Sequence, residues 1–164
     1  MVGAKRCGRW VGYFSLLVAL SGLLFIPATA GATPTTKLIS GAFTGTQVTG
    51  PSCTSPVGLC IHGTITGAIK GTFDLSASEI KSALPSGVVF IDGNSVVQST
   101  GGNLFLAFAA AVNTNAGSDG EFSSLDEITD GTGTFGSTSG YLQLAGTFVG
   151  GVEKGTYTGK LVTP

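Results

Sequence analysis

The chain carries little charge and few of the side chains that perform chemistry. Its 164 residues include eight Lys and Arg, nine Asp and Glu, one His and three Cys. Both arginines, Arg6 and Arg9, lie near the N-terminus. From residue 33 onward, five lysines stand against nine acids, a net charge of −4. Such a balance does not attract phosphate groups, so we expect no nucleic-acid partner and no anionic membrane partner.

The scarcity of nitrogen and sulfur ligands argues against two further classes of site. A zinc site needs more ligands than the single histidine, His62, and the few cysteines supply. A serine triad would need a Gly-x-Ser-x-Gly turn for its nucleophile, and the sequence has none. We therefore expect His62 at the surface, and we predict neither a metal site nor a cofactor.

The N-terminal segment has the order of a secretory signal peptide. Lys5, Arg6 and Arg9 make a basic start, residues 11–26 are uncharged and apolar, and Ala30 or Ala32 ends a small-residue cleavage site. The apolar run is short for an uncleaved membrane anchor. We expect residues 1–32 to be a signal peptide and residues 33–164 to be one domain, secreted to the extracellular space or the periplasm, with no membrane contact after cleavage.

Two cysteines, Cys53 and Cys60, lie within the expected mature chain. In an oxidising compartment the default for such a pair is a disulfide. The spacing is wider than that of a redox Cys-x-x-Cys motif. We predict a structural bridge that closes a six-residue loop.

The clearest structural pattern is a strict alternation over residues 61–75. Ile61, Ile65, Ile69 and Phe73 share one parity with glycines, and mostly polar residues occupy the other. Alternation is typical of a β-strand with one buried face. Large residues interleaved with glycine indicate a strongly curved sheet, because glycine relieves crowding inside a barrel. The pattern predicts one long strand in an all-β, single antiparallel β-barrel.

The rest of the chain completes a barrel of about eight strands. A capping box at residues 76–79 predicts one or two helical turns over 80–84, and the turn residues 92–94 predict a hairpin between 88–91 and 95–99. Further strands are expected at residues 37–49, 104–112, 122–129, 141–149 and 155–162, with Phe135 also in the sheet.

Residues 104–112 are apolar on both parities. The run is short for a helix, so it favours a strand buried on both faces. Its outer face would then be covered by the short helix or by another subunit, which predicts a dimer or trimer.

The segment 121–148 resembles the C-terminal half of the allene oxide cyclase and dirigent β-barrel superfamily. The resemblance implies an eight-stranded antiparallel barrel, often trimeric, with cyclase (isomerase) or guiding activity. Dirigent proteins usually carry basic residues where this chain has Thr134, Gly136 and Ser139, and no cyclase catalytic residue falls on a matched position. The matching residues are Gly131, Thr132, Gly133, Phe135, Gly140 and Tyr141.

These observations favour a secreted protein that binds a small hydrophobic ligand in the lumen of its barrel. Asp126 and Glu127 are neighbours on one strand, so one of them is expected to point inward, where burial would raise its pKa. The alternatives are a cyclase or dirigent-type isomerase, and a structural or adhesive surface protein. The expected ligand-binding residues are Ile65, Ile69, Phe73, Asp126, Glu127, Leu144 and Phe148.

Overall fold

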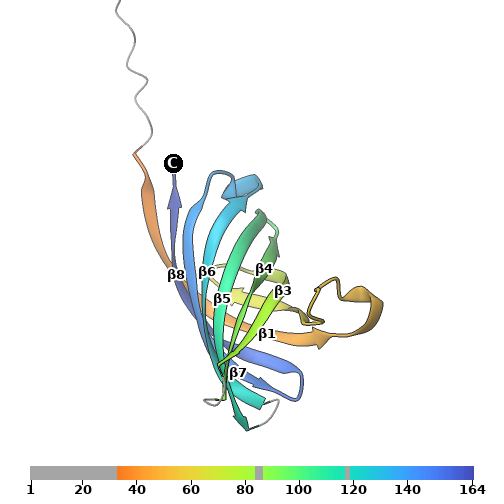
Figure 1. Cartoon of the computed structure of the whole chain (residues 1–164). Helices are drawn as coiled ribbons and strands as arrows, with labels where there is room; N and C mark the ends of the chain where they lie inside the picture. The colour runs from red at the N-terminus through yellow and green to blue at the C-terminus, as the bar shows by residue number, and fades with distance from the viewer. Residues whose placement is uncertain (1–32, 84–86, 117–118) are drawn as a thin grey trace, which may run out of the picture. The chain divides into compact units, whose positions relative to one another are not determined.

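A computed structural model describes residues 33–83, 87–116 and 119–164, which form a closed antiparallel barrel (Figure 1). Each strand pairs with the next along the chain, and β8 closes the sheet on β1. The all-β barrel fold is thus confirmed, whereas the expected signal peptide lies outside the described residues. The strands are β1 (Thr35–Val48), β2 (Cys60–Gly67), β3 (Gly71–Ala83), β4 (Val88–Ser99), β5 (Gly102–Ala116), β6 (Asp119–Gly131), β7 (Ser139–Val149) and β8 (Val152–Thr163).

Alternation along the strands separates the inner wall from the outer wall. On β1, Ile39 and Phe43 point inward and are buried, whereas Leu38 points outward and is 80% exposed. On β7 and β8, Leu142, Tyr157 and Leu161 are buried in the same way. The side-chain period of two therefore places one apolar set inside the barrel, as the sequence predicts.

The expected single strand over residues 61–75 is wrong, because the chain forms a hairpin there. Strand β2 ends at Gly67, whose φ of +101° belongs to the left-handed region that favours glycine. Strand β3 then runs back antiparallel, with Ile65 opposite Gly71. The turn leaves the inward parity unchanged, so the alternation in the sequence continues across it and hides it.

Two further local predictions are also wrong. Strand β3 continues to Ala83, through the expected capping box at 76–79 and into the helical turns expected at 80–84, with Ile80 paired to Ile91 and Ser82 paired to Val89. Strand β4 is continuous through the expected hairpin at 92–94. Gly93 lies on the inner wall, where an added Cβ would come within 2.6 Å of the Phe108 ring. Pairing of the two strands on both sides of an irregularity at Ser78 outweighs the local capping and turn signals.

Strand β5 carries the apolar run 104–112, and its two faces differ. Leu104, Leu106 and Phe108 are buried inside the barrel, whereas the alternate residues face outward and Ala109 is exposed. Among the described residues no helix covers this outer face, and cover by a second copy stays a prediction. Outside the strands lie two short 3₁₀ turns, η1 (Gly50–Ser52) and η2 (Gly133–Phe135), so Phe135 is not in the sheet. No helix in the described part of the chain is long and apolar enough to cross a membrane.

One end of the barrel is filled by side chains. Ile69 and Leu104 are buried there, in the same apolar cluster as Tyr157. The backbone N–H of Ile69 donates a hydrogen bond of 3.0 Å to the Tyr157 hydroxyl, which ties the β2–β3 turn to β8. The start of β1 and the end of β8 lie at this end, since Thr35 pairs with Thr163. Any space for a ligand therefore lies toward the opposite end.

Aromatic rings lie against glycines on the inner wall. An added Cβ at Gly63 would come within 2.5 Å of the Phe73 ring on the neighbouring strand. We expect Gly63→Ala to lower the free energy of unfolding by about 1–3 kcal/mol, because the ring has to leave its position against the wall. Urea unfolding measures the change, and Thr64→Ala on the outer face is the matched control. Equal midpoints for Gly63→Ala and the wild type would contradict this packing.

Candidate functional site

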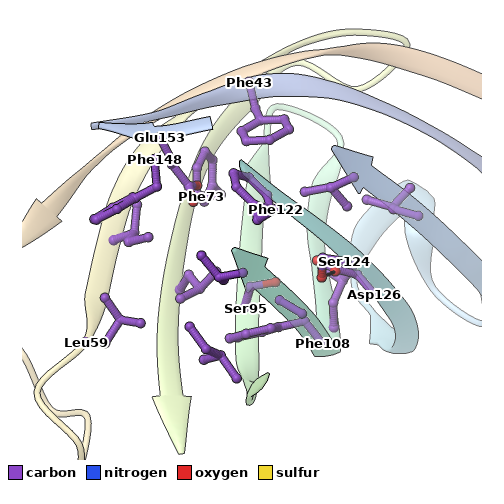
Figure 2. A pocket seen from close by; sticks show the side chains of 18 of the residues that line it. Phe43, Leu59, Phe73, Ser95, Phe108, Phe122, Ser124, Asp126, Phe148 and Glu153 are labelled. Atoms are coloured by element: carbon purple, nitrogen blue, oxygen red, sulfur yellow. Dashed lines mark hydrogen bonds between the residues drawn. The ribbon is translucent and has the colours of Figure 1, made fainter. Parts of the chain in front are cut away.

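A cavity of about 210 Å³ occupies the barrel interior beyond the filled end (Figure 2). Its wall is mostly Phe, Leu, Ile and Val, and it reaches Ile80, Val89 and Thr114 near the loop ends of β3, β4 and β5. Ile80 is partly exposed, so the cavity opens at the end opposite the start of β1 and the end of β8. An apolar cavity with few polar groups is the usual form of a small-molecule site.

Most of the residues expected to bind a ligand lie around this cavity. Ile65, Phe73, Leu144, Phe148 and Asp126 line it. The other two, Ile69 and Glu127, do not line it. Ile69 is buried in the filled end.

Glu127 lies on the outer face and is exposed. Successive residues of a strand point to opposite faces, so Asp126 inside requires Glu127 outside. Of these two neighbouring acids, Asp126 is the one that faces the lumen.

Asp126 is a buried carboxyl group in an apolar setting. It is 5% exposed, and its cross-strand neighbours are Phe108 on β5 and Leu142 on β7. The Ser124 hydroxyl, two residues earlier on the same face, donates a hydrogen bond to Asp126 Oδ1. Burial raises the pKa of Asp126 to about 6, and the hydrogen bond from Ser124 partly opposes that rise.

Glu153 is a second lumen carboxyl that the sequence analysis missed. It lies near the start of β8, opposite Gly45 on β1 and Phe148 on β7, and it is 7% exposed. Burial, together with the negative charge of Asp126, raises its pKa to about 7. Glu153 has the same parity as Tyr157 and Leu161, so starting the last strand two residues earlier would have found it.

No positive side chain balances these two acids within the described residues. The cavity lining contains neither lysine nor histidine. The lysines next to Glu153 and Leu161 in sequence, Lys154 and Lys160, fall on the opposite parity.

His62 is exposed, as expected, and its Nδ1 lies 2.7 Å from Asp74 Oδ1 on the outer wall. In the described part of the chain, no three His, Cys, Asp or Glu side chains are grouped as metal ligands.

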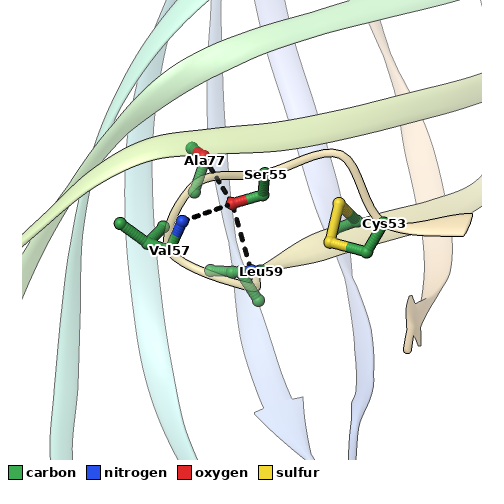
Figure 3. Close-up of a disulfide and its surroundings, with 6 residues drawn as sticks. Cys53, Ser55, Val57, Leu59 and Ala77 are labelled. Carbon is green, nitrogen blue, oxygen red and sulfur yellow. Dashed lines mark hydrogen bonds between the residues drawn. A yellow bond between two sulfur atoms is a disulfide. The ribbon is translucent and has the colours of Figure 1, made fainter. Parts of the chain in front are cut away.

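A disulfide braces the rim of the cavity (Figure 3). Cys53 and Cys60 are bonded, with 5.5 Å between their Cα atoms, which confirms the predicted bridge. Within the loop, the Ser55 hydroxyl donates to the Ala77 carbonyl at 2.6 Å and accepts the N–H of Leu59 at 3.2 Å. These bonds hold Leu59 where it lines the cavity.

Comparison of the chain with protein-family models, with curated proteins and with solved structures found no match.

The lumen acids make stability depend on pH. When folding raises the pKa of a carboxyl group, the group does not reduce stability at a pH below its pKa in the unfolded chain. The free energy of unfolding then falls as the pH rises from that pKa to the higher pKa of the folded protein. For Glu153 this window runs from its ordinary 4.5 to about 7. We expect the free energy of unfolding of Glu153→Gln, relative to wild type, to be higher at pH 8 than at pH 4 by about 3 kcal/mol.

Chemical denaturation at the two pH values measures this difference. Any fixed cost of the buried amide is the same at both pH values and cancels. Glu127→Gln, which removes the same charge from the outer face, is the control. A difference that stays constant between pH 4 and pH 8 would show that Glu153 is not held in an apolar environment.

Proposed function

We propose that this protein is secreted and binds a small, largely apolar molecule in the lumen of its barrel. The carrying observation is the open cavity of about 210 Å³ with its apolar wall. An eight-stranded barrel has room for side chains or for one small ligand. A cavity of about 150 Å³ accommodates benzene, so this lumen of about 210 Å³ suits a molecule of about eight or nine non-hydrogen atoms. The disulfide supports an oxidising compartment.

Filling the cavity tests this function. Wild-type protein is titrated with propylbenzene, and binding is followed by calorimetry or by NMR shifts. Ala110 lines the cavity and the neighbouring Ala109 faces outward, so the two give a matched pair of substitutions. We expect Ala110→Leu to weaken binding by about tenfold or more, and Ala109→Leu to leave it unchanged.

Native mass spectrometry of the protein from its own source adds a second measurement, since a co-purified small molecule supports the proposal. Absence of propylbenzene binding to the wild type at its solubility limit would count against the proposal, as would equal binding by both alanine variants.

A second candidate function is an isomerase of the cyclase kind, which the resemblance to allene oxide cyclases implies. The observation that favours it is the pair of acids in one apolar cavity, with pKa values of about 6 for Asp126 and about 7 for Glu153. Near neutral pH one group can accept a proton while the other donates one. The neighbouring apolar walls would fold a flexible substrate into a reactive shape.

This activity is tested with a small, uncharged unsaturated epoxide that fits the cavity as substrate, with cyclised product measured by chromatography. We expect Asp126→Asn and Glu153→Gln each to lower kcat by about 10²-fold or more, and Glu127→Gln to have no effect. Turnover that survives in both lumen variants, or that never exceeds the rate without protein, would remove the isomerase reading.

A further inference from the structure

We propose that the lumen selects a small apolar amine and binds its ammonium group at Glu153, where the charge of Asp126 adds to the attraction. This inference rests on the proposed ligand-binding function and names the chemical class of the ligand.

The first observation is the state of the Glu153 side chain. More than nine-tenths of this residue is buried, and it lines the cavity beside Phe73 and Phe148 (Figure 2). Its carboxyl group makes no hydrogen bond with any of the described residues. A buried carboxyl group without a partner is costly, and such groups are found at binding and catalytic sites. Glu153 therefore offers an acceptor that a bound molecule can use.

The second observation is that both charged groups of the cavity have the same sign. The inner faces of β1, β2, β3, β4, β5 and β7 contribute no titratable side chain to the described cavity lining. Strand β6 contributes Asp126 and β8 contributes Glu153, and the charge of Asp126 acts on Glu153. The Tyr157 hydroxyl, also on β8, already accepts a hydrogen bond from Ile69 in the filled end. The counter-charge therefore has to come from outside the described residues, and a bound molecule can supply it.

An ammonium group matches these two acids. It carries one positive charge and three N–H donors, so it can bond the unpartnered Glu153 carboxylate, and the negative charge of Asp126 also attracts it. The apolar body of the ligand would lie against Phe43, Phe73 and Phe122, whose ring faces also attract a cation. A fatty acid or another anion would be repelled by the same pair of acids.

Binding of a cation is linked to proton release. In the empty cavity near neutral pH, burial keeps these carboxyl groups partly protonated. An ammonium group favours their ionised forms, so its binding expels protons. The affinity for an amine should therefore rise between pH 5 and pH 8, and that for an uncharged isostere should not.

Isosteric probes separate this inference from the function on which it rests. Titration calorimetry compares 2-phenylethylamine, 2-phenylethanol and propylbenzene at pH 5 and pH 8, in two buffers of different ionisation heat. We expect the amine to bind about tenfold or more tightly than propylbenzene at pH 8, with buffer-dependent heats that report proton release. At pH 5 this preference should be lost.

Variants locate the effect in the cavity. Glu153→Gln and Asp126→Asn should each abolish the preference for the amine and keep propylbenzene binding. Glu127→Gln should change neither. Circular dichroism establishes that each variant is folded, and two lumen variants ensure that one can be tested if the other does not fold.

The possible results have distinct meanings. Propylbenzene binding with no preference for the amine would overturn this inference and leave the proposed function standing. Equal affinity for the alcohol and the amine would also overturn it, because hydrogen bonding without charge would then suffice. No binding by any of the three probes would overturn both.

Discussion

The interior of a closed eight-stranded sheet is narrow, and the whole structure depends on how that space is divided. Side chains from every strand point into a lumen that holds little more than themselves. Glycines on the wall leave room for large rings beside them, as Gly63 does for Phe73 and Gly93 does for Phe108. Branched side chains fill the end near the termini. The space that these side chains do not fill is the cavity. The sheet surrounds the cavity laterally, and the cavity opens at one end of the barrel.

Strand register decides which acids occupy that space. A shift of one residue in β6 would turn Asp126 outward and bring Glu127 inside, together with every other side chain of the strand. The observed register places Asp126 and Glu153 in surroundings that raise both pKa values, so near neutrality the empty barrel is less stable than an apolar wall would make it. Sites that reduce stability in this way are characteristic of function.

The sequence predicted the class of fold well because its evidence was distributed over many residues. Inward apolar residues alternate with outward residues along the strands, as Ile39 and Phe43 alternate with Leu38 on β1. This alternation depends only on the period of a strand. The disulfide was also predictable, since Cys53 and Cys60 are the pair that the expected mature chain contains.

Strand boundaries were less predictable. The turn after Gly67 preserves parity, and Gly93 resembles a turn residue although it lies on the wall of β4. Residues 61–75 were counted as one strand but belong to β2 and β3, and residues 88–99 were counted as two strands but form β4. The two errors cancel in the total of eight. Glu153 was missed because an acid two residues before Gly155 is typical of the turn between the predicted strands 141–149 and 155–162. Its burial depends on neighbours from β1 and β7 that no local pattern reveals.

The pairing of Thr35 with Thr163 brings the start and the finish of the barrel together at its filled end. A chain segment, surface anchor or fused partner joined at either terminus would leave the molecule on the side away from the rim that the Cys53–Cys60 bridge braces. Attachment at either end of the barrel sheet would therefore leave the rim open to the surrounding solution.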